Sequence, residues 1–90
     1  MNKVTLSGHI LVPPADLPKI RAALPDHIEK TRAEAGCIVF TVEENQCEAG
    51  RFDVYEEFES KEAFEAHQTR ARESDWGRVA KNVARHYSVE

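Results

Sequence analysis

Two ionisable residues in the second half of the chain have the types that proton transfer requires. His67 lies in the run FESKEAFEAHQTRARESDW, one helical turn after Phe64 and shortly before Trp76, the only tryptophan. A histidine can act as a general base or donate a hydrogen bond at neutral pH, because its ordinary pKa lies near 6.5. The same residues also suit ordinary packing, with His67 bonded to a carboxylate or a carbonyl and Trp76 sealing a small core. Both interpretations stay open on sequence alone.

Glu56 is the second candidate, because it interrupts a hydrophobic pattern. It lies in RFDVYEEFE on the face that also carries Phe52, Val54 and Phe58. A carboxylate on such a face must be paired or protonated, since isolated burial of charge is costly. The expected partners are His27, His67 or Arg85. Glu56 could therefore tune a catalytic histidine, or it could form a structural pair that joins a helix to a strand.

The elements that must position these residues can be read from periodicity. The run KVTLSGHILVP alternates as a strand with one hydrophobic face and ends at Pro13 and Pro14. A helix capped by Asp16 follows; Pro25 inside it predicts a kink or a short break near Leu24, and Gly36 is expected to close it. Its hydrophobic stripe comprises Leu17, Ile20, Leu24, Ile28 and Ala35.

The second half of the chain alternates strands and helices again. CIVFTVEE is predicted to be a strand with Ile38, Phe40 and Val42 on one face, and RFDVYEEFE is the next strand. Ser60 is expected to cap the helix that carries His67, and Ser74 to start a short helix with Trp76. RHYSV is the last strand, and it places Arg85, Tyr87 and Val89 on one face.

The resulting order is β-α-β-β-α-α-β, in a single domain over residues 1–90. This order predicts an α+β ferredoxin-like sandwich, with a four-stranded antiparallel sheet and helices on one side. The other face of the sheet is half apolar, which is more typical of a contact surface than of open surface. We therefore expect a two-fold homodimer with sheet packed on sheet. The predicted face holds Thr5, Ser7, Leu11, Cys37, Val39, Thr41, Tyr55 and Tyr87 or its neighbours.

Composition excludes several classes of function. The net charge is −4 and the basic residues are scattered, so neither nucleic acid nor an anionic membrane is expected as a partner. We expect no export signal or membrane span, and both Cys37 and Cys47 are predicted to be free thiols in a reducing cytoplasm. The histidines lack metal-motif spacing, so no metal is predicted.

Two stretches resemble the antibiotic biosynthesis monooxygenase (ABM) family: LPDHIEKTRAEAGCIVFTV and FDVYEEFESKEAFEAHQTRARESDWG. The resemblance implies a small dimeric α/β barrel that oxidises electron-rich phenols, anthrones or quinols with O2 and without a bound cofactor. The substrate would lie in a pocket between the helices and the sheet. The haem-degrading branch of this family uses an Asn, a Trp and a proximal His; here His67 and Gly77 stand where that Trp and His would be, so haem cleavage is not expected.

The predicted site follows from the residues and the resemblance together. His67 and Glu56 are the predicted catalytic residues, and the predicted substrate contacts are Trp76, Phe64, Phe40, His27, Arg85 and Tyr87. Two functions remain open. The first is a cofactor-independent monooxygenase acting on a small aromatic phenol or quinol. The second is a non-catalytic dimeric module of the same fold that binds a small hydrophobic metabolite.

Overall fold

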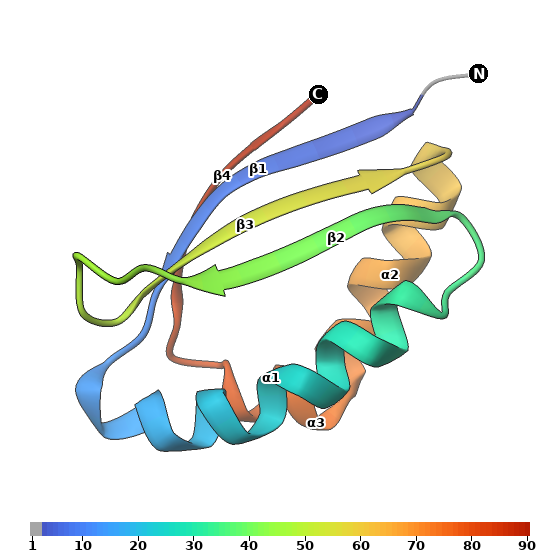
Figure 1. Ribbon diagram of the computed structural model, residues 1–90. Helices are drawn as coiled ribbons and strands as arrows, with labels where there is room; N and C mark the ends of the chain where they lie inside the picture. Colours follow the sequence, from blue (N-terminus) through green and yellow to red (C-terminus); the bar gives the residue numbers. More distant parts are fainter. Residues whose placement is uncertain (1–2) are drawn as a thin grey trace.

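Four strands form one antiparallel sheet in the computed structural model, which describes residues 3–90. They are β1 (Val4–Leu11), β2 (Cys37–Glu44), β3 (Arg51–Phe58) and β4 (Ala84–Val89), in the spatial order β2-β3-β1-β4. A short 3-10 helix, η1 (Pro14–Asp16), precedes α1 (Leu17–Arg32), and α2 (Lys61–Glu73) and α3 (Asp75–Val79) follow β3. All three α-helices lie on one side of the curved sheet (Figure 1). The predicted ferredoxin-like α+β fold is therefore confirmed.

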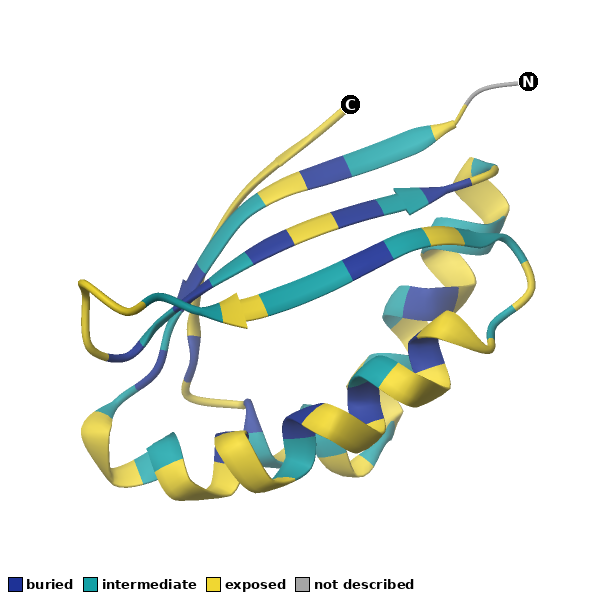
Figure 2. Cartoon of the chain, in the orientation of Figure 1, coloured by how far each residue is buried: buried dark blue, intermediate teal, exposed yellow. Residues whose placement is uncertain are grey.

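The strand alternation decides which side of the sheet the helices cover. On β3, Phe52, Val54, Glu56 and Phe58 are all buried, while the residues between them are half-buried or exposed. Leu6 and Ile10 of the paired strand β1 are buried on the same side. Figure 2 shows this alternation along β3 and buried positions on the inner side of α1. The predicted hydrophobic faces of β1 and β3 are confirmed.

The second strand departs from its predicted register. A bulge lies between Cys37 and Val39, so Cys37 pairs with Phe58 and Val39 with Glu57. Ile38 is the extra residue and is 52% exposed, and the prediction that it shares a face with Phe40 is wrong. The same bulge moves Cys37 to the register of the helix-covered side, so Cys37 does not belong to the open face either.

The first helix ends earlier than predicted, before Ala35 and Gly36, and it is uninterrupted. Pro25 lies inside α1, yet the helix is continuous from Leu17 to Arg32, so the predicted break is absent. The buried residues Ile20, Leu24 and His27 hold the helix against the sheet on both sides of the proline, and this packing outweighs the backbone hydrogen bond that proline removes.

The predicted helix caps are confirmed for α2 but not for α1 or α3. Ser60 caps α2 as predicted, accepting a hydrogen bond from the amide of Ala63 at 3.1 Å. Ser74 does precede α3, but its hydroxyl donates to the carbonyl of Ala71 and does not cap the helix. Asp16 also makes no cap bond. Gly36 lies beyond the end of α1 with φ +90°, where a Cβ would approach the Cβ of Ala63 to 2.6 Å.

The open side of the sheet carries a mixed surface. Tyr55 is 37% exposed and β4 is exposed along its length. His9 and His86 stack on neighbouring strands with ring centroids 4.9 Å apart. Tyr87 pairs with Gly8, on the helix-covered side, so it is the neighbours of Tyr87 that belong to the open face. Cys37 and Cys47 are free thiols, and no helix within residues 3–90 is long and apolar enough to cross a membrane.

Candidate active site

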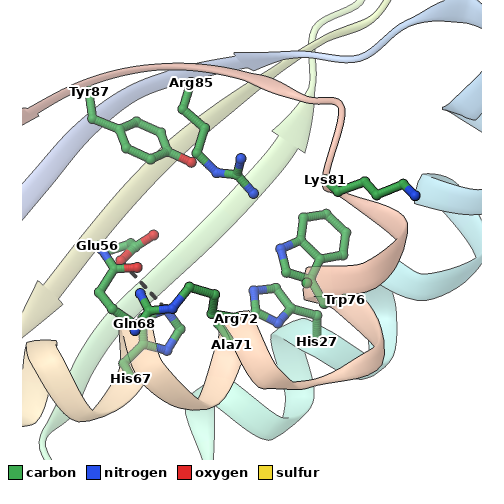
Figure 3. Close-up of a pocket in the computed structure, with 11 residues that line it drawn as sticks. His27, Glu56, His67, Gln68, Ala71, Arg72, Trp76, Lys81, Arg85 and Tyr87 are labelled. Carbon is green, nitrogen blue, oxygen red and sulfur yellow. Dashed lines mark ion pairs between the residues drawn. The ribbon is translucent and has the colours of Figure 1, made fainter.

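A cavity of about 640 Å³ opens between the sheet and the C-terminal helices. Residues from five elements converge on it, as Figure 3 shows. The α2 helix contributes one face of the wall through His67, Gln68, Ala71 and Arg72, and α3 contributes Trp76 and Gly77. The opposite walls come from α1, β3, β4 and the loop before β4, through His27, Glu56, Arg85, Tyr87 and Lys81.

The structure brings most of the predicted site residues together. Six of the predicted residues line this cavity: His67, Glu56, Trp76, His27, Arg85 and Tyr87. Phe40 and Phe64, which we expected in the wall, lie behind it. Phe40 is 3% exposed and packs edge-on against the rings of His27 and His67, each with centroids 5.5 Å away. Phe64 packs against Phe58 instead. The two phenylalanines therefore pack behind the residues of the wall and do not line the cavity.

His67 is held in a defined orientation by a carboxylate that sequence reasoning did not assign to it. Its Nδ1 lies 2.9 Å from Oε1 of Glu34, in the turn after α1. A carboxylate accepts, so Nδ1 carries the proton and Nε2 is left with a free lone pair. Burial lowers the pKa of His67, against the raising effect of Glu34. The ring is therefore neutral at pH 7 and basic at Nε2.

Glu34 is itself fixed by a second partner. Arg70 of α2 pairs with its other carboxylate oxygen and donates to Oγ1 of Thr31 at 3.0 Å. Thr31 is fully buried, so this guanidinium joins α1 to α2 directly behind His67. Arg70 therefore has a structural role at the site.

Glu56 stands on the other side of the His67 ring. Its Oε1 is 3.9 Å from Nε2 of His67, beyond hydrogen-bonding distance, and this buried oxygen has no hydrogen-bond partner in the described chain. Burial first, and then Glu34, raise the pKa of Glu56 to about 7. Of the three predicted partners, His67 is the one within ion-pair distance. The carboxyl group can thus hold or release a proton near neutrality.

The aromatic wall is a stacked pair. The rings of Trp76 and His27 have centroids 4.6 Å apart and planes 6° from parallel. His27 is 5% exposed, and its Nδ1 is buried without a hydrogen-bond partner among residues 3–90. Burial, helped by His67 and Arg70, lowers the pKa of His27 to about 3, so the ring is neutral. It offers a flat surface and one polar atom at the cavity.

The position of Trp76 depends on its neighbour. A Cβ at Gly77 would lie 2.2 Å from the carbonyl oxygen of Arg72, so α3 meets the end of α2 backbone to backbone. This tight corner brings the indole of Trp76 onto His27.

The roof of the cavity comes from β4. Tyr87 points its hydroxyl toward the guanidinium of Arg85 (Figure 3). Burial of the hydroxyl raises the pKa of Tyr87 to about 12, against the lowering effect of Arg85, so the group remains a donor at neutral pH. The guanidinium of Arg85 donates from Nη1 to the carbonyl of Val83 at 3.3 Å and from Nη2 to the carbonyl of Ala80 at 3.4 Å, and these two bonds hold the group in place.

Sequence reasoning missed four polar residues of the site: Glu34, Gln68, Arg72 and Lys81. Glu34 shares a helical stripe with His27 and Thr31, which was the available signal, but its contact depends on the turn after Arg32. Arg72 and Lys81 carried no signal, because neither hydrophobic periodicity nor a motif marks an exposed cation. Among residues 3–90 there is no cluster of three or more His, Cys, Asp or Glu residues that could hold a metal ion.

Similarity to known proteins agrees with this architecture. The fold and its cavity define a small ferredoxin-like α+β domain with a pocket between helices and sheet. The chain belongs to the antibiotic biosynthesis monooxygenase family, whose sequence model matches residues 4–77. A search of curated protein sequences gave no significant match.

Several solved structures share the fold at low sequence identity. A candidate antibiotic biosynthesis monooxygenase from Nitrosomonas europaea is 19% identical, with a TM-score of 0.81 over 98% of this chain and 86% of that one. A protein from Bacteroides thetaiotaomicron described as a possible oxidoreductase is 18% identical, with a TM-score of 0.76 over 98% and 93%. MupZ from Pseudomonas fluorescens is 19% identical, with a TM-score of 0.79 over 99% and 71%.

Proposed function

We propose that the protein is a cofactor-independent monooxygenase that oxidises a small aromatic phenol or quinol, such as an anthrone, with O2. The observation that carries the proposal is the arrangement of His67, whose Nδ1 is bonded to Glu34 while Nε2 faces the cavity beside Glu56. A fixed, neutral imidazole with a free nitrogen is the arrangement a general base needs. Membership of the monooxygenase family supports the reaction class.

The first step of the reaction is proton removal. Nε2 of His67 takes the proton of the substrate's phenolic or enolic hydroxyl and leaves an electron-rich anion in a largely enclosed site. The proton on Nδ1 stays in place and is donated to the carboxylate of Glu34. This hydrogen bond stabilises the imidazolium that forms. An anion of this kind is oxidised far more easily than its neutral parent, so activation of the substrate takes the place of activation of O2.

The remaining steps balance without another reductant. The anion transfers one electron to O2, and the resulting radical and superoxide combine into a carbon–oxygen bond. The hydroperoxide then loses water: its O–O bond breaks, one oxygen stays as a carbonyl, and the other leaves with two hydrogens. For an anthrone, a CH2 group becomes C=O and one water is released. His67 returns its proton in the last step, and Glu56, with a pKa of about 7, is a second proton donor at the same place.

We also propose that the working form is a homodimer joined through the open sheet face. Half-buried Leu11 and Val39 and exposed Tyr55 lie on that face. A sheet with one bare, partly apolar side gains stability by covering it. Light scattering after gel filtration should give about twice the 10.2 kDa mass of one chain; a particle of one chain contradicts this proposal.

The decisive experiment records O2 uptake with anthrones and naphthoquinols, with no flavin or metal added. His67→Ala should lower kcat/KM by about 100-fold or more, as general-base removal does. Arg78→Gln is the matched control, because Arg78 pairs with Asp75 outside the cavity and should keep full activity. Circular dichroism checks that both variants fold.

The pH profile adds a second readout. Because the pKa of His67 is lowered, activity should persist below pH 6.5, and Glu56→Gln should remove an inflection near pH 7. Binding of these compounds without turnover above the His67→Ala variant would contradict the monooxygenase proposal and favour a non-catalytic binding module.

A further inference from the structure

We propose that the substrate of this cavity carries a carboxylate, held by Arg72, Lys81 and Arg85, in addition to its oxidisable hydroxyl. This inference deepens the proposed function and rests on the same cavity. The three cations come from different parts of the fold, namely α2, the loop after α3, and β4. Their side chains border one cavity (Figure 3).

Most arginines outside the cavity have a carboxylate as partner. Arg21, Arg51, Arg70 and Arg78 each pair with a carboxylate, and Arg32 donates to the carbonyl of Phe40. Within residues 3–90, Arg72, Lys81 and Arg85 form no ion pair, although the chain has more acidic than basic residues, 16 against 12. A chain with surplus acidic groups therefore leaves three positive charges uncompensated around one cavity.

The carboxyl group of Glu56 does not compensate them. It is the one carboxyl group in the wall, and with a pKa of about 7 it is largely protonated below neutrality. The wall is consequently positive and attracts anions, and because the three cations are exposed this attraction should weaken with added salt. A carboxylate also accepts two parallel hydrogen bonds from an arginine, which fixes the orientation of the ligand.

A second observation points to a polar ligand. Oε1 of Glu56 and Nδ1 of His27 are buried at the cavity wall and have no hydrogen-bond partner within residues 3–90. Buried polar atoms are almost always satisfied, so these two lack a partner that a ligand or water would supply. The stacked rings of Trp76 and His27 offer the flat surface that an aromatic ligand needs. Together these features describe a hydroxylated aromatic carboxylate.

The experiment is isothermal titration calorimetry at pH 6, where Glu56 is largely protonated, with three compounds of one skeleton: 6-hydroxy-2-naphthoate, its methyl ester and 2-naphthol. The carboxylate should bind at least about tenfold more tightly than the ester, which corresponds to about 1.4 kcal/mol. Raising the salt from about 50 to 500 mM should weaken the carboxylate several-fold and leave the ester unchanged. Equal or tighter binding of the ester, or no binding of the carboxylate at millimolar concentration, overturns the proposal.

Variants locate the carboxylate. Arg72→Gln and Lys81→Gln should each weaken the carboxylate about fivefold, with no effect on the ester, and both side chains lack structural hydrogen bonds in the described chain. Arg85→Gln should do the same, although it also loses the bond to Val83. Arg78→Gln is the control and should bind like the wild type. Wild-type affinity in both Arg72→Gln and Lys81→Gln contradicts the assignment.

Failure of this proposal is distinct from failure of the proposed function. Preferential carboxylate binding without O2 uptake removes the monooxygenase activity and keeps the anion site. O2 uptake on neutral quinols, without carboxylate preference in binding, keeps the activity and removes the anion site.

Discussion

Phe52 and Val54 of β3 pack among aliphatic side chains, whereas Glu56 and Phe58 of the same strand face the ring of His67. The first half of the sheet is a dry core, with Leu6, Ile10, Ile20 and Leu24 around it. The second half and the part of α1 that faces it contain two buried polar atoms next to a cavity, and neither has a hydrogen-bond partner in the described part of the chain. Buried polar groups lower stability unless they are paired. The half around Phe52 and Val54 therefore stabilises the fold, whereas the half around Glu56 forms a site at a cost in stability.

The largest effect on stability should come from the apolar half of the sheet, around Phe52 and Val54. Phe52 is 1% exposed, and Phe52→Ala should lower the free energy of unfolding by about 3–5 kcal/mol, because it opens a cavity among rigid neighbours. Urea denaturation at a fixed protein concentration measures this. Glu65→Ala, on the exposed side of α2, is the control and should change stability by less than about 0.5 kcal/mol. A loss below about 1 kcal/mol for Phe52→Ala would mean that this half is not the stabilising core.

An intermediate effect should come from Glu56, and it depends on pH. The pKa of Glu56 is about 7 in the folded chain and about 4.5 when unfolded, so the folded state holds the proton more tightly. The contribution of Glu56 to stability is therefore fully present below pH 4.5 and is lost as pH rises through 7. The difference corresponds to about 3 kcal/mol.

Glu56→Gln tests this effect against the wild type. The variant should gain about 3 kcal/mol relative to the wild type between pH 4.5 and 8. Using the difference matters, because His27 has the opposite sign: its pKa is lowered to about 3, so its contribution is lost as pH falls below 6.5. Parallel stability curves for the two proteins in denaturant titrations would contradict the burial argument for Glu56.

How far the sequence predicts each half follows from the same contrast. Strict alternation in β3 was enough to identify Phe52 and Val54 as core, because a period of two allows only two faces. In β2 the bulge at Ile38 broke this rule, and no residue type in CIVFTVEE marks it. Glu56 stood out as the exception in its pattern, which predicted that its burial would need a partner or a proton and left His27, His67 and Arg85 open as that partner.

The contacts of the site were harder to predict than the faces. Glu34 reaches His67 from a turn whose geometry depends on where α1 ends, and that end came four residues before the predicted Gly36. Arg72 of α2 and Arg85 of β4 border the same cavity, and no sequence pattern marks that arrangement. Neither arrangement shows in the periodicity of the sequence. The sequence therefore predicts the helices and strands but not the contacts between their side chains.

The smallest effect should separate stability from ligand binding. Ser60→Ala removes the cap of α2 and should cost about 1 kcal/mol in the free energy of unfolding. His67 lies on the same helix but well after the first turn, so affinity for 6-hydroxy-2-naphthoate should stay within about twofold of the wild type. A parallel loss of affinity in calorimetry would show that the cavity depends on the whole helix and would weaken the contrast between the halves.

Gly77 has a consequence for how this domain could be redesigned. Since α3 touches α2 main chain to main chain there, even a methyl group would force the corner open and carry the indole of Trp76 away from His27. The width of the cavity therefore depends on the absence of a side chain at Gly77. Substrate range should be easier to alter at Gln68 or Ala71, whose side chains border the cavity without holding that joint together.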